Sequence, residues 1–179
     1  VTSFHGSAAP GLLIGGFMVD LALKNLPEGE FFDAICETPV CLPDSIQLLT
    51  PCTIGNGWLT IFNFGKFAVT LYEKMTGEGV RVYLDMEKLK NYPEVYSWFL
   101  KLKKKKEQDS ELLLGQIKEA GEGILSIQRI RVEPENIRRK RMGSVAVCPV
   151  CGEAYPVRDG EKCRNCNGES PYLEMKACS

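Results

Sequence analysis

Two Cys-x-x-Cys motifs near the end of the chain constrain its fold more than any other feature. The first is Cys148-Pro-Val-Cys151, and after eleven residues comes Cys163-Arg-Asn-Cys166. A two-residue spacing lets one tight turn direct both thiolates at the same ion, and Zn²⁺ takes four such ligands in a tetrahedron. Four cysteines leave no open coordination position, so the motifs predict a structural rather than a catalytic zinc.

The same cysteines could instead form two disulfides, or one pair could act as a redox motif. Two matched pairs fit a Cys₄ zinc site better than a lone redox motif. Gly152 follows the first pair, and Asn167-Gly168 follows the second. These residues tolerate the left-handed backbone that such turns often require. The geometry of the zinc domain, ribbon or treble clef, stays open at this point.

Length and composition indicate one core domain with a small appendage. The chain has 179 residues, of which 44% are hydrophobic, and its eight cysteines are half clustered and half scattered. A chain of this size does not need disulfides for stability, so we expect a reducing, cytoplasmic location. There is no long uninterrupted apolar run, and we expect neither a membrane span nor a signal peptide.

Charge argues against nucleic acid as a partner. The formal net charge is −1, and residues 144–179 hold four basic and five acidic residues. A phosphate-binding module would carry a clear basic excess. Basic residues do gather in two runs, 101–106 and 138–141. Such runs are more typical of a solvated surface or a linker than of a binding patch.

Hydrophobic patterning predicts an α+β core over residues 1–135. Its sheet should be antiparallel or mixed and packed with helices. We expect a basic linker over 136–143 and the Cys₄ zinc domain over 144–179. The elements expected in the core are helices at 11–26, 44–50, 94–106 and 110–120, and strands at 31–37, 58–64, 67–74, 80–85 and 124–132.

The front half contains a second group of soft ligands. His5 is the only histidine, and Cys36, Cys41 and Cys52 are spread along the following 50 residues. A free cysteine is often a small core residue, and Cys36, inside an expected strand, fits that role best. A lone histidine is usually an ordinary polar side chain.

The order of several short motifs resembles the FmdE family, which is named after formylmethanofuran dehydrogenase. The resemblance covers residues 3–85, and the zinc motifs match a tail that many members carry. The motifs are Phe4-His5-Gly6, Pro10-Gly11, Glu37-x3-Cys41-x2-Asp44-x-Ile46-Gln47, Cys52-Thr53-x-Gly55, Gly65-Lys66 and Arg81-Val82. The resemblance implies an α+β core, a homodimer and association with a molybdenum or tungsten pterin oxidoreductase that reduces CO₂ onto methanofuran.

The chain departs from the family pattern at its opening loop. Members usually read His-Gly-His-x-Cys-Pro-Gly, whereas Ser7 and Ala9 replace the second histidine and the cysteine here. The front site is therefore either degenerate or rebuilt from His5, Cys41 and Cys52. One histidine and two cysteines are enough for a second transition-metal site with an open position.

Three classes of function follow from these features. The first is a metal-binding accessory or sensor protein without catalysis of its own. The second is a thiol- or metal-dependent redox enzyme using Cys41 and Cys52, although no nucleophile–base set is recognisable. The third is a nucleic-acid-binding zinc protein, which the charge balance disfavours. The sequence has no glycine-rich phosphate loop or dinucleotide fingerprint that would indicate a nucleotide cofactor.

Overall fold

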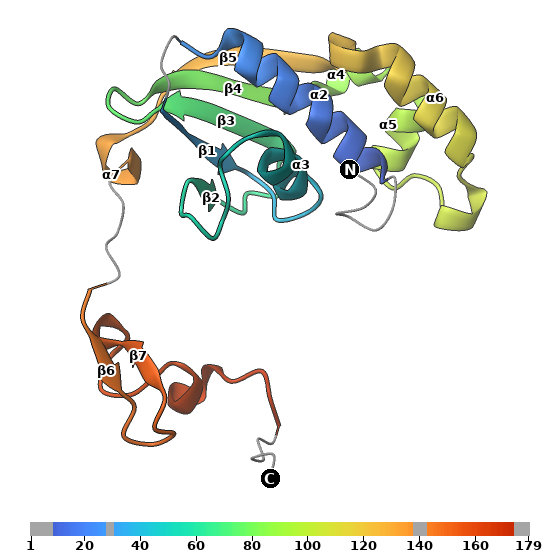
Figure 1. Ribbon diagram of the computed structural model, residues 1–179. Helices are drawn as coiled ribbons and strands as arrows, with labels where there is room; N and C mark the ends of the chain where they lie inside the picture. Colours follow the sequence, from blue (N-terminus) through green and yellow to red (C-terminus); the bar gives the residue numbers. More distant parts are fainter. Residues whose placement is uncertain (1–8, 28–30, 138–142, 174–179) are drawn as a thin grey trace. The chain divides into compact units, whose positions relative to one another are not determined.

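The computed structural model describes residues 9–27, 31–137 and 143–173. The chain divides into two compact units, Val1–Arg138 and Arg139–Ser179. The first contains a five-stranded sheet with helices, and the second a small two-stranded sheet (Figure 1). The α+β class with a small C-terminal cysteine domain is therefore confirmed. Among the described helices, none combines the length and apolar character needed to cross a bilayer.

A mixed sheet in the order β2-β1-β3-β4-β5 forms the centre of the first unit. Antiparallel pairing joins β1 to β3, β3 to β4 and β4 to β5, while β2 runs parallel to β1. The strands are β1 (Phe32–Cys36), β2 (Leu59–Ile61), β3 (Ala68–Glu73), β4 (Glu78–Leu84) and β5 (Leu125–Arg131). β2 is shorter than the expected strand 58–64.

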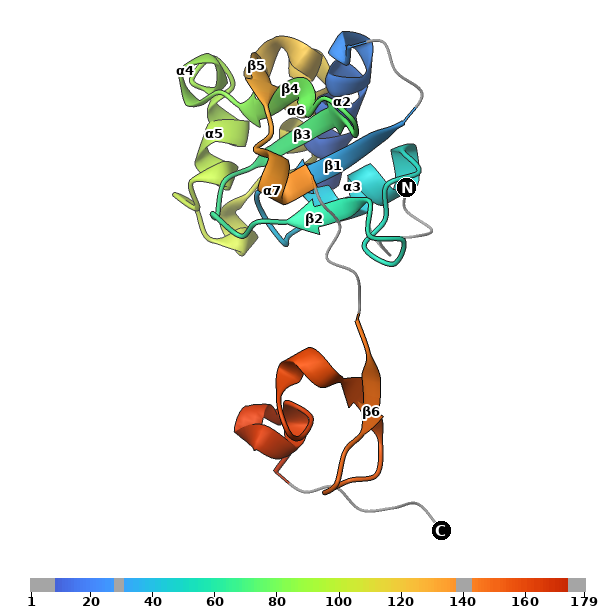
Figure 2. The ribbon, with the colours of Figure 1, turned by 90° about the vertical axis from the view of Figure 1, so that its left-hand side faces the viewer.

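The parallel pairing of β1 and β2 depends on helix α3 (Leu42–Leu49), which lies between them in sequence. A parallel pair needs a crossover connection, and a helix usually supplies it. α3 contacts both strands and lies beside them in space (Figure 2). Cys41 is the residue immediately before this helix, so the crossover fixes its position at the end of β1.

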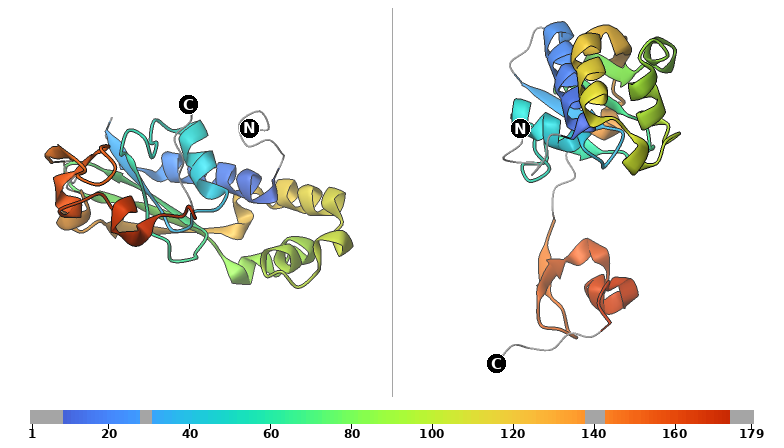
Figure 3. Two further views of the ribbon diagram at one scale, coloured as in Figure 1. Left: turned by 90° about the horizontal axis from the view of Figure 1, so that it is seen from below. Right: turned by 90° about the vertical axis from the view of Figure 1, so that its right-hand side faces the viewer.

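Helix α2 (Pro10–Asn25) contacts β3 and β4 and packs side by side with α6 (Figure 3). Pro10 occupies the first turn, where its missing N–H costs no hydrogen bond. Gly15 lets α2 approach α3 closely, because a Cβ there would lie 2.4 Å from Ser45 Oγ. The Ser45 hydroxyl donates a hydrogen bond to the Leu12 carbonyl across the same contact.

The sheet contributes alternate residues to the core, as the two-residue period of a strand requires. One row across the sheet contains Ala34, Leu71 and Val80, and all three side chains are buried. The adjacent residues Ile35 and Arg81 point to the other face and are only partly buried. Cys36 is fully buried in the core, as expected from its place in the strand.

Short helices follow the hairpin β3–β4. They are α4 (Met86–Leu89), α5 (Pro93–Phe99) and α6 (Ser110–Ala120), with one 3₁₀ turn at Lys105–Glu107. Asp109 caps α6 by accepting hydrogen bonds from the Glu111 and Leu112 amides. The expected helix 94–106 is too long, because α5 ends at Phe99. The helix α7 (Pro134–Ile137) includes the first two residues of the expected linker.

Candidate metal centre

The second unit places its first cysteine pair in the turn of a short hairpin. Strands β6 (Val145–Val147) and β7 (Ala154–Pro156) pair antiparallel, and Cys148 and Cys151 lie between them. The Gly152 amide donates to the Cys148 carbonyl at 2.9 Å, which closes the turn. Gly152 has φ of 76°, a conformation that glycine adopts without a Cβ penalty.

The second pair enters the short helical turn η4 (Asn165–Glu169). The Asn167 amide donates to the Cys163 carbonyl at 3.0 Å, and the Cys166 amide donates to Cys163 Sγ at 3.4 Å. Gly168 has φ of 96° and ends the turn. The left-handed backbone expected after each motif is therefore present, and a glycine adopts it in both cases.

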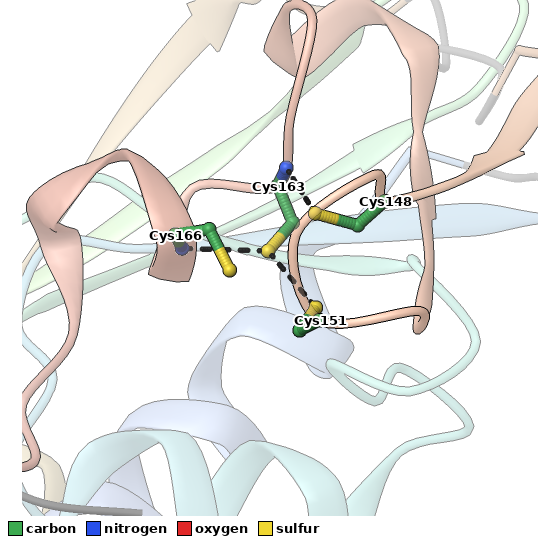
Figure 4. A group of neighbouring side chains, drawn as sticks. All are labelled: Cys148, Cys151, Cys163 and Cys166. Carbon is green, nitrogen blue, oxygen red and sulfur yellow. Dashed lines mark hydrogen bonds between the residues drawn. The ribbon is translucent and has the colours of Figure 1, made fainter.

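The four sulfur atoms gather at one point, as Figure 4 shows for Cys148, Cys151, Cys163 and Cys166. All four lie within 4.8 Å of one another, and the Cys151 and Cys163 sulfurs are 3.8 Å apart. A tetrahedral zinc with Zn–S bonds of about 2.3 Å separates its sulfurs by about 3.8 Å. The donor set therefore fits Zn²⁺ in number, element and spacing.

Backbone amides favour a thiolate at one of the four ligands. The amides of Cys151 and Cys163 donate toward Cys148, and they lower the pKa of that thiol to about 6. The shared contact with Cys163 raises the pKa of Cys166 to about 12, with burial adding to the effect. Four sulfurs this close cannot all carry negative charge without a cation, and a divalent metal supplies the charge that they need.

The disulfide alternative does not match the geometry. The seven cysteines of the described segments are free thiols. A disulfide needs two sulfurs about 2.05 Å apart, well below the 3.8 Å between Cys151 and Cys163. The four cysteines of the second unit are therefore arranged as ligands of one ion.

Of the candidate front-site residues, Cys41 lies half-buried beside the first turn of α2. A Cβ placed on Gly11 would be 3.2 Å from Cys41 Sγ and 3.7 Å from the Phe67 ring. Burial raises the pKa of the Cys41 thiol, and the negative charge of Asp44 raises it further. The thiol therefore lies at the edge of the core, where the protein holds it mainly in the protonated form.

Cys52 occupies a different place. It is fully buried, and its thiol lies 3.6 Å from the Phe32 carbonyl at the first residue of β1. Burial raises the pKa of this thiol as well. Its surroundings are those of a packed core residue.

The structure does not bring Cys41 and Cys52 together. Cys52 lies at the Phe32 end of β1, whereas Cys41 follows the other end and lies near Phe67. Four residues of strand separate these ends by about 13 Å. A single ion would need its sulfur ligands within about 4 Å of one another. His5, the third expected ligand, lies outside the described residues, as does Ser7.

The structure surrounds Cys41 with residues that sequence reasoning does not connect with it. Trp98, Phe99 and Lys101, from α5 and the residues after it, line the same hollow as Cys41. Sequence periodicity assigns Trp98 and Phe99 to a core-facing stripe and Lys101 to a solvated run. No short-range motif links them to a cysteine 57 or more positions earlier, so only the fold reveals the group.

Comparison with known proteins adds two family models. Residues 4–131 match the model described as FmdE, molybdenum formylmethanofuran dehydrogenase operon. Residues 139–173 match the model of the FmdE treble clef zinc finger. The second match selects between the two zinc-domain geometries that the sequence left open. It agrees with a ligand pair from a hairpin turn and a ligand pair from a helical turn.

One solved structure and one curated protein are similar over nearly the whole chain. The first is the crystal structure of an FmdE-like protein of tungsten formylmethanofuran dehydrogenase from Syntrophus aciditrophicus. It is 58% identical, with a TM-score of 0.89, and the match covers 96% of this chain and 90% of that chain.

The second is a probable S-adenosyl-L-methionine-binding protein of Archaeoglobus fulgidus, 31% identical over 186 residues. The match covers 92% of this chain but only 50% of that protein, so this chain spans about half the length of its curated relative. The two family models together account for both units of the structure. The chain belongs to the FmdE family and carries the treble clef zinc finger of that family after its core.

Proposed function

We propose that this protein is a metal-binding accessory protein in which a structural Zn²⁺ holds the second unit folded. The observation that carries the proposal is the convergence of four cysteine sulfurs within 4.8 Å. Four thiolates close the coordination sphere, so a substrate or water molecule has no position on the metal. The ion then contributes to folding and not to chemistry.

The small core of the second unit supports a folding role for the metal. Among its described residues, only two hydrophobic side chains, Cys148 and Tyr155, are buried. Val145, Val147 and Val150 remain exposed. So little buried apolar surface cannot offset the entropy of ordering the segment, whereas zinc binding contributes about 10–16 kcal/mol in comparable modules.

The proposal extends to partners. The description of the matching family and the name of the similar Syntrophus protein both refer to formylmethanofuran dehydrogenase. We place this chain beside a molybdenum or tungsten pterin oxidoreductase in the cytoplasm, as a homodimeric accessory protein without catalysis of its own. The exposed valines of the second unit are suited to docking, because apolar surface that the unit leaves uncovered is a common feature of binding sites.

The alternative of a redox enzyme using Cys41 and Cys52 receives no support from the thiol positions. A dithiol couple needs Cα atoms within about 7 Å. The two cysteines contact opposite ends of β1, roughly 13 Å apart by strand rise. A nucleic-acid-binding role also lacks a specific observation in its favour.

Elemental analysis of the purified protein tests the zinc proposal. The full chain should hold one zinc per chain, and a version ending at residue 142 should hold none. A truncated core that retains the zinc, or a full chain that holds none after expression with zinc in the medium, would contradict the proposal.

The partner is tested separately by mixing the protein with a purified tungsten formylmethanofuran dehydrogenase and measuring the mass of the complex by light scattering. The Cys148→Ser variant is the control and should bind more weakly, because its second unit lacks the metal. Equal binding by both forms, or binding by neither, would count against docking through the second unit.

A further inference from the structure

The first unit contains a pocket that none of the features discussed above explains. It has a volume of about 380 Å³ and lies beside the start of α2, at the half-buried thiol of Cys41. Its lining comes from four separate segments of the chain, represented by Gly11, Cys41, Phe67 and Trp98. The volume falls within the range of small-molecule sites, about 300–1,000 Å³.

Backbone strain converges on this pocket. Within the described residues, the two non-glycine residues with positive φ are Cys41, at 57°, and Lys101, at 55°. They are 60 positions apart in sequence, yet both line the pocket. Such conformations cost about 1–3 kcal/mol each, and they cluster at functional sites, where the surrounding structure holds them in place.

At Cys41 the strain takes the form of a tight three-residue turn. The Leu42 amide donates to the Val40 carbonyl at 2.6 Å, which closes a γ-turn of the rare type around Cys41. This turn joins the end of β1 to the start of α3 and directs the cysteine toward Gly11. A Cβ at Gly11 would meet Cys41 Cβ at 3.1 Å, so the glycine keeps room for the sulfur at the floor of the pocket.

At Lys101 the strain belongs to the end of α5. The Leu102 amide donates to the Ser97 carbonyl and the Lys101 amide to the Trp98 carbonyl, which is the Schellman pattern. Glycine is the usual residue at the left-handed position of this motif, and here it is lysine. A position that glycine would occupy without strain therefore carries a long cationic side chain at the pocket.

Aromatic rings form one wall of the pocket. Phe67 and Phe99 meet edge to face with centroids 6.0 Å apart, and Trp98 lies 6.1 Å from Phe99. All three rings line the pocket. A row of aromatic rings offers flat apolar surface on which a planar ring can stack.

Positive charge also lies at the pocket. Lys101 and Lys105 both line it, and neither side chain forms an ion pair with any residue in the described segments. The first turn of α2, which contains Gly11, has no acidic side chain, and its free amides add partial positive charge. Asp44 acts on Cys41 electrostatically but does not line the pocket.

We propose that this pocket binds a planar aromatic compound that carries an anionic group. The rings of Phe67, Trp98 and Phe99 receive the planar part, and Lys101 and Lys105 receive the anion. The site is independent of the zinc and lies wholly within the first unit. Strain at Cys41 and Lys101 is the cost of holding the thiol and the ammonium group at the pocket.

Two probes separate the aromatic contribution from the anionic one. 1-Anilinonaphthalene-8-sulfonate carries a sulfonate, and N-phenyl-1-naphthylamine has the same rings without it. Binding is followed by quenching of Trp98 emission in a Trp58→Phe background, where Trp98 is the remaining tryptophan of the two in the chain. The sulfonate probe should saturate this signal and bind more tightly than the neutral probe.

Three lysine variants then assign the charge. Lys101→Gln and Lys105→Gln should each weaken the sulfonate probe about three- to fivefold and leave the neutral probe unchanged, since exposed charge pairs contribute modestly. Lys106→Gln is the matched control, because Lys106 belongs to the same run but does not line the pocket. Equal losses in all three variants, or no loss in the first two, would overturn the proposal.

A final variant tests the strain. Lys101→Gly relieves the positive φ and removes the charge, so it should raise the midpoint of thermal unfolding while weakening the sulfonate probe as Lys101→Gln does. An unchanged affinity in both Lys101 variants would overturn the proposal. Lys105→Gln lies on an exposed 3₁₀ turn and keeps the test decisive even if a Lys101 variant folds poorly.

Discussion

Glu37 and Arg81 form a two-point ion pair that reaches across strand β3. Arg81 Nε donates to Glu37 Oε1 at 2.5 Å, and Arg81 Nη2 donates to Oε2 at 2.8 Å. Arg81 also donates to Gln128 on β5 at 3.0 Å. The bond to Glu37 raises the pKa of Arg81, and both partners are mostly buried. One side chain thus ties the end of β1 to β4 and to the edge strand.

Removal of this ion pair should destabilise the core. Arg81→Ala leaves the largely buried Glu37 carboxylate without its partner and should lower the free energy of unfolding by about 2–3 kcal/mol. Urea unfolding followed by tryptophan fluorescence measures the loss, because Trp58 and Trp98 both belong to the first unit. Lys90→Ala, which breaks the exposed pair with Glu87, is the control and should change stability by less than about 0.5 kcal/mol. Equal effects of the two variants would show that the burial of the first pair is unimportant.

The neighbouring glycines Gly15 and Gly16 should respond to alanine in opposite directions. A Cβ at Gly15 would clash with Ser45, 2.4 Å away at Oγ, so Gly15→Ala should cost about 1–3 kcal/mol. At Gly16 the nearest atom is 4.0 Å away, and alanine there should stabilise helix α2 by about 0.5–1 kcal/mol. Thermal unfolding of the two variants beside the unchanged protein checks the signs. A stable Gly15→Ala protein would mean that α2 and α3 can move apart at little cost.

Cys148→Ser should release the zinc and unfold the second unit alone. The four sulfurs form one coordination shell, and the described unit buries little else that could hold it together. Limited proteolysis should cleave within 143–173, while the tryptophan-monitored unfolding of the core stays unchanged. Val147→Ser, next to the ligand but exposed, should keep its zinc and its protease resistance. A metal-free variant with a protease-resistant second unit would rule out the folding role of the ion.

Among the core thiols Cys36, Cys41 and Cys52, alkylation should reach Cys41 first, and slowly. It is half-buried, whereas the other two are fully buried. The thiolate is the reactive form, and the raised pKa of Cys41 leaves little of it near pH 7. The rate with iodoacetamide should therefore rise about tenfold per pH unit and continue to rise past pH 9. Mass spectrometry of the labelled peptides identifies the site, and a plateau below pH 8 would contradict the protonated state inferred for Cys41.

Local patterns are sufficient to predict most elements of the core. Helix 110–120 agrees with α6, since Asp109 and Gly121 mark its ends in the sequence as in the structure. The predicted helix 94–106 is too long because lysine is an ordinary helix former. Lys101 takes a left-handed conformation in the structure, and intrinsic propensity gives no sign of it.

The two metal predictions differ in how far apart their ligands lie in sequence. In the Cys₄ motif each pair is fixed by a single turn, so only two turns need to meet. Cys41 and Cys52 are separated by the whole of α3, and the crossover helix places one at each end of β1. The pocket at Cys41 depends on four distant segments, and no local pattern can predict their meeting.

The connection between the units leaves the sheet from its edge strand. β5 pairs only with β4, and Arg131, opposite Glu78, is the last residue of β5 before the chain continues through α7 to the zinc unit. Mechanical tension on the zinc unit would thus act on the exit end of β5 and would open the β4–β5 hydrogen bonds one after another, like a zipper. β1, β3 and β4 have neighbours on both sides, so the edge strand would yield at low force while the interior of the sheet stayed intact.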